Sequence, residues 1–316
     1  MSRALGVSPA QQWAAPDCLQ RPLPAAGEPR RYAAITGACR RGGTLRPMTE
    51  HEEIERYYDG GVDAEWTRLE RRPVEFEMTR RHLDSLLPRG CSVVDVGSGP
   101  GRYAIYLAER GHDVTLVDLS QRNLDRAASE ARRRGLRLSA LHHLSAVHMP
   151  DLKDESSDAV LCLGPLYHIT EDRQRREVIS ECLRVLKAGG VALFAFVSLY
   201  AHVVARIGNG RLELRPGEME EYEYILQNQT NRNLEVVHFT HAWYTDPNQI
   251  APLMEGIGFK TERIACLEPF GLARAEAVEL LSPETKTQWF DYLYQVSTAS
   301  SILGASQHLL YCGRKV

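Results

Sequence analysis

Three glycines at alternate positions, framed by acidic residues, carry the clearest chemical pattern in the sequence. They stand in the segment Val-Val-Asp-Val-Gly-Ser-Gly-Pro-Gly-Arg-Tyr at 93–103, where a predicted buried strand turns into a helix. Glycine allows a tight turn and lets the backbone approach a ligand with no Cβ in the way. Asp118 ends the next predicted strand, where an acid can accept hydrogen bonds from both hydroxyls of a ribose. The pattern therefore predicts a nucleotide-like ligand at this turn.

The details of the turn separate two kinds of nucleotide site. The glycines are Gly97, Gly99 and Gly101, and Arg102 stands where a dinucleotide-binding fingerprint has a small residue. Asp95 precedes the first glycine and has no role in the dinucleotide pattern. These differences disfavour a nicotinamide dehydrogenase. A purely structural sheet-to-helix turn is the plainer alternative, and the strand and helix patterns on both sides disfavour it.

The elements that must position these residues alternate between strand and helix. Val/Leu/Ala-rich runs without strict alternation indicate strands that are buried on both faces. We therefore expect an α/β fold with a doubly wound, mostly parallel, seven-stranded sheet. The expected strands are 92–96, 113–118, 136–142, 159–163, 190–197, 259–267 and 308–313, and the expected helices are 103–109, 123–134, 171–187, 247–256 and 283–296.

Three segments lie outside this alternation. Residues 1–47 hold seven arginines, six prolines and only two acids, and this composition predicts a disordered leader. The alternatives are a transit peptide and upstream sequence that precedes a start at Met48. Residues 52–90 predict a helical cover, with one helix over 51–58 that ends at Asp59-Gly60-Gly61 and a second over 73–87. Residues 200–245 follow the fifth strand, where an insertion predicts a substrate cap. We expect 48–316 to form a single domain.

Composition sets the broad class of the protein. The 316 residues are 43% hydrophobic and 25% charged, as in globular proteins, and the net charge of −3 leaves no basic field for nucleic acid or an anionic membrane. The longest apolar runs are too short to span a bilayer. Seven scattered cysteines without a C-x-x-C pair indicate reduced thiols, and no metal-ligand spacing is present. We therefore expect a cytoplasmic protein without a metal, and the choice between monomer and homodimer stays open.

Four sequence segments resemble motifs of one enzyme family. The segment at 94–103 is similar to the first motif of the class I S-adenosylmethionine-dependent methyltransferases, and Val-Asp-Leu-Ser at 117–120 to their ribose-binding second motif. Ser-Asp-Ala-Val-Leu-Cys-Leu-Gly-Pro-Leu-Tyr-His at 157–168 is similar to the fourth motif, and Arg-Val-Leu-Lys-Ala-Gly-Gly at 184–190 to the turn into the fifth strand. The resemblance covers 52–315 and is strongest to a bacterial small-molecule subgroup. It implies a Rossmann-like methyltransferase fold and S-adenosyl-L-methionine as the cofactor.

The resemblance also implies which residues bind the cofactor. Asp95 is expected to meet the methionine amino group, Asp118 the ribose hydroxyls, and Leu119 the adenine face. Ser145 stands where the family often has an acid, so a side-chain bond to the adenine amino group is left open. The implied cofactor-binding residues are Tyr57, Asp95, Gly97, Ser98, Gly99, Gly101, Asp118, Leu119, Ser145, Ala146, Leu163 and Gly164.

The candidate catalytic residues are Tyr58, Tyr167 and His168. Tyr167 and His168 follow the fourth strand, where a base can take a proton from a hydroxyl or an amine near neutral pH; a packing role is the alternative. Tyr58 can hold a sulfonium or a substrate cation on its aromatic face. The candidate substrate contacts are His241, Trp243 and Tyr244 at the end of the insertion, and Glu65, Trp66 and Arg68 by position alone.

These observations predict methyl transfer from S-adenosylmethionine to an O, N or C nucleophile of a small molecule, such as a secondary metabolite. The sulfonium is already a strong electrophile, so the protein has to align a nucleophile, exclude water and sometimes remove a proton. One alternative is an intramolecular cyclisation of the cofactor, which would give a four-membered ring and methylthioadenosine. Another is a non-catalytic module that binds S-adenosylmethionine.

Overall fold

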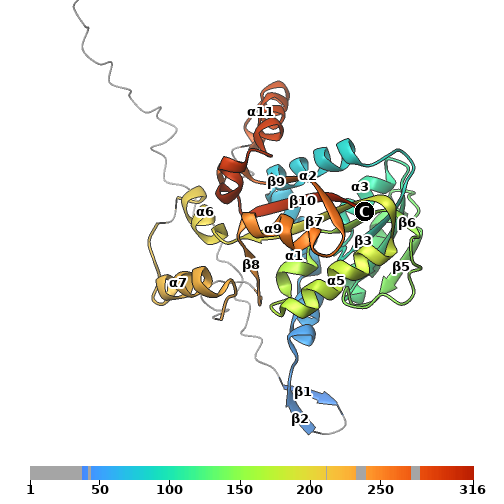
Figure 1. Ribbon diagram of the computed structural model, residues 1–316, viewed down its shortest axis with the longest axis horizontal. Helices are drawn as coiled ribbons and strands as arrows, with labels where there is room; N and C mark the ends of the chain where they lie inside the picture. Colours follow the sequence, from blue (N-terminus) through green and yellow to red (C-terminus); the bar gives the residue numbers. More distant parts are fainter. Residues whose placement is uncertain (1–37, 42–43, 211, 233–239, 272–277) are drawn as a thin grey trace, which may run out of the picture. The chain divides into compact units, whose positions relative to one another are not determined.

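The computed structural model describes residues 38–41, 44–210, 212–232, 240–271 and 278–316 (Figure 1). The chain divides into two units, Met1–Ala34 and Ile35–Val316, and every described residue belongs to the second. The predicted leader over 1–47 lies outside the described residues, except for an antiparallel pair formed by β1 (Ala38–Arg41) and β2 (Thr44–Pro47).

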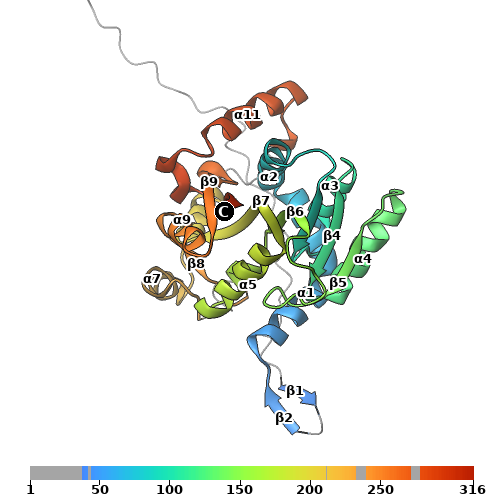
Figure 2. The same ribbon diagram turned by 45° about the vertical axis from the view of Figure 1, so that its right-hand side comes forward.

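One large sheet forms the centre of the second unit. Its order is β5-β4-β3-β6-β7-β10-β9, and Figure 2 shows β9, β7, β6, β4 and β5 in that sequence. β10 is antiparallel to both of its neighbours and the other pairs are parallel, which confirms the predicted mostly parallel sheet. Seven strands were predicted, whereas the sheet that the structure describes has eight, because the two-residue β8 also pairs with the end of β7. The strands are β3 (Ser92–Val96), β4 (Asp113–Asp118), β5 (Ala140–His143), β6 (Ser157–Cys162), β7 (Leu186–Ser198), β8 (Tyr244–Thr245), β9 (Phe259–Cys266) and β10 (His308–Lys315).

Helices cover both faces of this sheet, because successive residues of a strand point to opposite sides. Val93 and Leu193 enter one buried cluster, whereas Val94 and Phe194, the next residues along, enter another. The first cluster includes side chains of α1 (Glu50–Arg71), α2 (Pro73–Leu86), α3, α4 and α11, and the second includes side chains of α5 and α9. The covering helices of the alternating part are α3 (Arg102–Ala108), α4 (Gln121–Arg133), α5 (Asp172–Val185), α9 (Pro247–Glu255) and α11 (Pro283–Val296).

The strand predicted at 136–142 starts later than expected. Gly135 has a φ of +67° and its N–H donates to the Arg132 carbonyl, while the N–H of Leu136 donates to the Ala131 carbonyl. These bonds satisfy the last carbonyls of α4, as a glycine after a helix commonly does. The apolar residues that follow Gly135 therefore begin as part of the helix end, and β5 starts only at Ala140.

The helical cover differs from the prediction in its first helix. α1 runs over Glu50–Arg71 and passes through Gly60 and Gly61, which were expected to end it; α2 spans Pro73–Leu86, close to the prediction. Each glycine costs a helix interior about 1 kcal/mol relative to alanine. Contacts with the start of α4 offset this cost: the Ser120 hydroxyl donates to Asp59 and Arg122 donates to the Asp59 carbonyl.

The insertion after β7 contains two described helices, α6 (Ala201–Gly208) and α7 (Glu218–Asn228), and then β8. Its end returns to the sheet, where Tyr244 pairs with Val197 in parallel register. A single antiparallel bridge joins Thr230 to Trp243. Among the helices that the structure describes, none is both long and apolar enough to cross a bilayer.

Candidate active site

The glycine turn joins β3 to α3 and is fixed to β4 through the backbone. The N–H groups of Gly97 and Ser98 both donate to the Val117 carbonyl, with N–O distances of 2.7 and 3.2 Å. Gly97 has a φ of +66°, and a Cβ there would lie 2.3 Å from Cγ of Pro165. Gly99 has a φ of +53° and no atom closer than 3.9 Å to an added Cβ. Both positions favour glycine because their φ angles are positive. At Gly97 there is also no room for a side chain next to Pro165.

A cavity of about 1020 Å³, counting the part open to solvent, lies beside this turn at the carboxyl ends of β3, β4 and β6. That edge of an open parallel sheet is where ligands bind in this class of fold. Most of the predicted catalytic and cofactor-binding residues line the cavity. They are Tyr58, Asp95, Gly97, Ser98, Gly99, Asp118, Leu119, Ser145, Ala146, Leu163, Gly164, Tyr167 and His168.

Two of the residues implied or proposed for the cofactor do not line this cavity. Gly101 has a φ of +83°, and an added Cβ would lie 2.7 Å from Cβ of Ala127. Gly101 therefore allows α3 and α4 to pack closely. Tyr57 packs edge-on against Tyr58, with 5.3 Å between the ring centroids.

The three predicted substrate contacts at the end of the insertion also lie away from the cavity wall. Trp243 and Tyr244 are buried, and the Trp243 ring lies under the guanidinium of Arg175 at 4.1 Å. His241 contacts Glu53 of α1, with 3.1 Å between Nε2 and the carboxylate. Tyr244 belongs to β8, which extends the sheet beside β7, and Trp243 forms the bridge to Thr230, so these two residues help to hold the insertion in place. A further histidine of this region, His238, lies outside the described residues.

Asp95 is almost fully buried, with 2% of its surface exposed, and its Oδ2 has no hydrogen-bond partner among the described residues. Burial, and then the neighbouring carboxylate of Asp118, raise the pKa of Asp95 to about 7. A buried carboxyl group without a partner is unfavourable unless it is protonated or meets a donor. Because Asp95 lies on the cavity wall, it is suited to bind a cationic donor.

Asp118 at the end of β4 is held in one orientation by three hydrogen bonds. Its Oδ1 accepts from the N–H of Ser120 at 2.9 Å and from Asn123 Nδ2 at 3.2 Å, and its Oδ2 accepts from the N–H of Gly99 at 2.7 Å. Burial raises the pKa of Asp118, and these bonds act in the opposite direction. A carboxylate offers about four acceptor sites. Asp118 thus links the end of β4 to the glycine turn and can still accept from a ligand hydroxyl.

Tyr58 of α1 reaches across the cavity to His168, which follows β6. The Tyr58 hydroxyl lies 2.5 Å from His168 Nε2, and His168 Nδ1 lies 2.7 Å from the Thr240 hydroxyl. Burial is the main cause that lowers the pKa of His168 to about 4. A hydrogen bond with the His241 backbone acts against this shift, and the Arg68 charge acts with it. His168 is therefore a neutral imidazole near pH 7.

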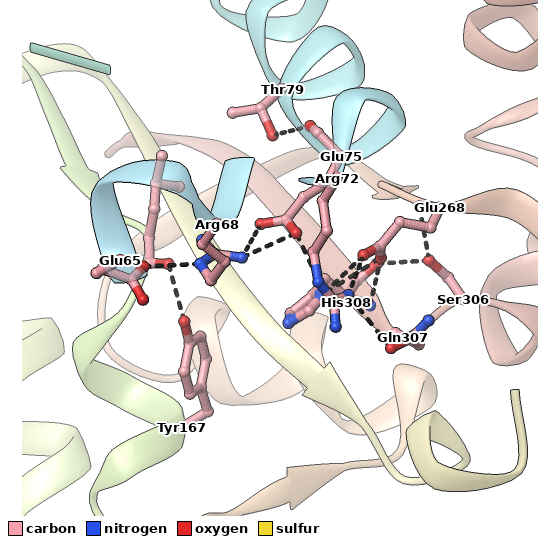
Figure 3. A network of polar contacts seen from close by, with 11 residues as sticks. Glu65, Arg68, Arg72, Glu75, Thr79, Tyr167, Glu268, Ser306, Gln307 and His308 are labelled. Atoms are coloured by element: carbon pink, nitrogen blue, oxygen red, sulfur yellow. Dashed lines mark hydrogen bonds and ion pairs between the residues drawn. The ribbon is translucent and has the colours of Figure 1, made fainter. Parts of the chain in front are cut away.

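Glu65 and Arg68, which the sequence suggested by position alone, also line the cavity. Figure 3 shows Arg68 between Glu65 and Glu75. Its Nε donates to Glu65 at 2.7 Å, and its Nη1 donates to both Glu75 oxygens at 2.8 and 2.9 Å. Burial on its own would raise the pKa of Glu75, but Arg68, His308 and Arg72 outweigh it and lower that pKa to about 2. Arg68 is thus fixed on the cavity wall.

The same network continues away from the cavity (Figure 3). Arg72 donates to Glu268 at 3.1 Å, and His308 Nδ1 lies 3.0 Å from the same carboxylate. Glu75, Glu268 and His308 bring ligand atoms within 4.8 Å of one another, as a metal site would. Each of the two carboxylates already pairs with a guanidinium, so we interpret the group as an ion-pair network that joins α2 to the loops before β10.

Comparison with known proteins places this geometry in a family. Residues 93–190 match a family model described as a methyltransferase domain. A ubiquinone biosynthesis O-methyltransferase from Idiomarina loihiensis is 31% identical over 134 residues, which cover 42% of this chain and 53% of that protein. A tRNA 5-carboxymethoxyuridine methyltransferase from Escherichia coli is 29% identical over 134 residues, with coverages of 42% and 50%. The chain spans about half the length of the curated relatives it matches.

One solved structure shows which fold the chain shares. A solved S-adenosylmethionine-dependent methyltransferase from Methanosarcina mazei has a TM-score of 0.52 and 16% sequence identity, and the match covers 74% of this chain and 97% of that one. The chain therefore contains a methyltransferase domain over residues 93–190, and its fold is that of the S-adenosylmethionine-dependent methyltransferases. The cofactor of this family is S-adenosylmethionine.

The residues of the methyltransferase domain fit that cofactor. Asp95 Oδ2 is a buried acceptor that lacks a partner among the described residues, and it suits an ammonium group. Gly97 and Gly99 leave backbone without side chains at the cavity edge. Asp118 presents a fixed carboxylate at the end of the neighbouring strand, where ribose hydroxyls are bound in nucleotide folds.

Proposed function

We propose that this methyltransferase domain transfers a methyl group from S-adenosylmethionine to an O, N or C nucleophile of a small molecule. The observation that carries the proposal is the buried, unpartnered carboxylate oxygen of Asp95 on the wall of a cavity beside the glycine turn. A methionine ammonium is a donor of the matching charge, and a charge-assisted hydrogen bond to it compensates the burial of Asp95.

The cavity also supplies partners for the other groups of the methyl donor. Asp118 would accept from the ribose hydroxyls, and Leu119 would pack on the adenine face. Arg68, fixed by its acidic neighbours on the cavity wall, would hold the methionine carboxylate. When bound, S-adenosylmethionine supplies an activated methyl group, so these residues have to orient it and exclude water.

The shape of the cavity favours a small acceptor. Tyr58, Glu65 and Arg68 all line it from α1, and Tyr58 contacts His168 on another wall. An acceptor therefore has to fit beneath α1. The net charge of −3 gives the chain no general attraction for a polyanion. Both features support a small molecule over a tRNA, although one relative is named for a tRNA nucleoside.

Product analysis with methyl-labelled S-adenosylmethionine tests the proposal. The protein is incubated with a metabolite extract from which macromolecules have been removed and, separately, with total tRNA. We expect S-adenosylhomocysteine and label in the small-molecule fraction. Label in the tRNA would refute the proposed acceptor class. Methylthioadenosine in place of S-adenosylhomocysteine would show cyclisation, and the absence of any cofactor turnover with intact binding would indicate a non-catalytic module.

A further inference from the structure

A chain of hydrogen bonds leads from the cavity into the insertion. The Tyr58 hydroxyl lies 2.5 Å from His168 Nε2, and His168 Nδ1 lies 2.7 Å from Thr240 Oγ1. The Thr240 hydroxyl in turn donates to the His241 carbonyl at 3.1 Å. Tyr58 and His168 line the cavity, whereas Thr240 is buried behind them.

The direction of these bonds follows from counting protons. The Thr240 hydroxyl has one proton, and the His241 carbonyl takes it because a carbonyl can only accept. Thr240 Oγ1 then accepts from His168, which places the ring proton on Nδ1. The hydrogen bond of His168 with the His241 backbone, which raises the pKa of the ring, is also one in which the ring donates. In a neutral imidazole the other nitrogen is an acceptor. His168 Nε2 therefore accepts the proton of the Tyr58 hydroxyl, and the Tyr58 oxygen keeps lone pairs for a group in the cavity.

We propose that Tyr58 and His168 form a proton relay for the methyl acceptor, and that Thr240 is the positioning residue that sets the His168 tautomer. The proposal rests on the proposed function. The methyl acceptor in this scheme has a nucleophile that carries a proton. It is therefore a hydroxyl or an amine. Tyr58 and His168 are catalytic residues in this scheme, and Thr240 acts through His168.

The atoms and charges of the step balance. The acceptor oxygen or nitrogen gains the bond to the methyl carbon, and the C–S bond of the donor breaks with its electron pair left on sulfur. The acceptor proton moves to the Tyr58 oxygen, while the Tyr58 proton moves to His168 Nε2. The donor loses one positive charge as the imidazole gains one, so the net charge of this buried region does not change. That conservation compensates for the burial that opposes a charged His168.

The relay also explains why tyrosine stands between the acceptor and the histidine. The phenol of Tyr58 is itself hard to ionise, because burial raises its pKa well above the usual value. A relay avoids a free phenolate, since Tyr58 gives up its proton to Nε2 as it receives another. His168 in the opposite tautomer would carry a proton on Nε2 and could not accept one there.

The first test reads the His168 tautomer by ¹⁵N NMR of the ring and needs no acceptor. The wild-type protein is expected to show Nδ1 protonated and Nε2 as the acceptor. Thr240→Val removes the hydroxyl and is expected to shift the ring toward the other tautomer, whereas Thr240→Ser keeps it. Thr287→Val is the matched control, because the exposed Thr287 hydroxyl also donates to a backbone carbonyl, that of Pro283 at 2.9 Å. A wild-type ring protonated on Nε2 overturns the relay.

The second test uses the acceptor that the labelled-donor experiment identifies. Thr240→Val and Tyr58→Phe are each expected to lower kcat about 100-fold, the usual lower bound for a general base, with the KM for S-adenosylmethionine unchanged and with Thr240→Ser close to wild type. If the wild-type enzyme transfers methyl groups and Thr240→Val has the same kcat, the relay is overturned but the proposed function is not. A wild type that transfers none overturns the proposed function as well.

Discussion

Replacing Asp95 by asparagine should stabilise the protein when no ligand is bound, and the gain should depend on pH. The pKa of Asp95 is raised from 3.8 to about 7. In the folded protein this carboxyl group therefore holds its proton more tightly than in the unfolded chain. The wild-type protein is therefore most stable, as far as this group is concerned, at low pH. Its unfolding free energy falls as the pH rises toward 7, because the unfolded carboxyl ionises freely and the buried one does not.

The size of the effect follows from the shift. Three pKa units correspond to about 4 kcal/mol of unfolding free energy above pH 7, at about 1.4 kcal/mol per unit. At pH 5 the unfolded carboxyl is ionised and the folded one is not, so only about 1.6 kcal/mol of that cost is present. Asp95→Asn removes the cost at both pH values. Its stability gain over wild type should thus be about 2.5 kcal/mol larger at pH 8 than at pH 5.

Urea unfolding followed by circular dichroism at pH 5 and pH 8 measures this difference. Asp113→Asn at the exposed start of β4 is the matched control and should show no such change. S-adenosylhomocysteine should raise the stability of the wild type more than that of Asp95→Asn, because the variant lacks the charge that pairs with the ammonium. An equal gain at both pH values would refute the reasoning that burial raises this pKa.

Three further predictions concern neighbouring residues. Asp118→Ala should weaken S-adenosylhomocysteine binding by about 1–3 kcal/mol in calorimetry, because the ribose hydroxyls lose their acceptor; unchanged affinity would mean that Asp118 does not face the ribose. Gly97→Val should abolish binding, since its Cβ would lie 2.3 Å from Pro165 Cγ, and normal affinity in a folded variant would contradict the role of the turn. Glu75→Gln should lower the unfolding free energy by about 3 kcal/mol, because it leaves Arg68 without its main partner; stability equal to wild type in urea unfolding would count against the network.

The sequence was sufficient for the elements whose signals are local. The strand at Asp113–Asp118 and the helix at Pro283–Val296 have the predicted bounds, since apolar runs, a proline and a serine cap mark them. The glycine turn and its two aspartates were likewise predicted to meet at one ligand. Gly60 and Gly61 misled the prediction, because their helix is stabilised by contacts with Ser120 and Arg122, far along the chain.

The rest of the site depends on contacts between distant segments. Thr240 gave no signal in the sequence, because its role comes from its position behind His168, 72 residues earlier. Arg68 drew attention only by position, and its partner Glu75 drew none, although Arg68 lines the cavity and Glu75 holds it there. Trp243 looked like a substrate contact because it is aromatic and lies in an insertion, yet the fold uses it in the core.

A crystal structure with S-adenosylhomocysteine would show how this cavity binds the methyl donor. We expect the ligand ammonium within hydrogen-bond distance of Asp95 Oδ2, the ribose hydroxyls on Asp118, and the sulfur directed toward Tyr58 and His168. A ligand bound elsewhere, or bound in this cavity with Asp95 still unpartnered, would contradict this expectation.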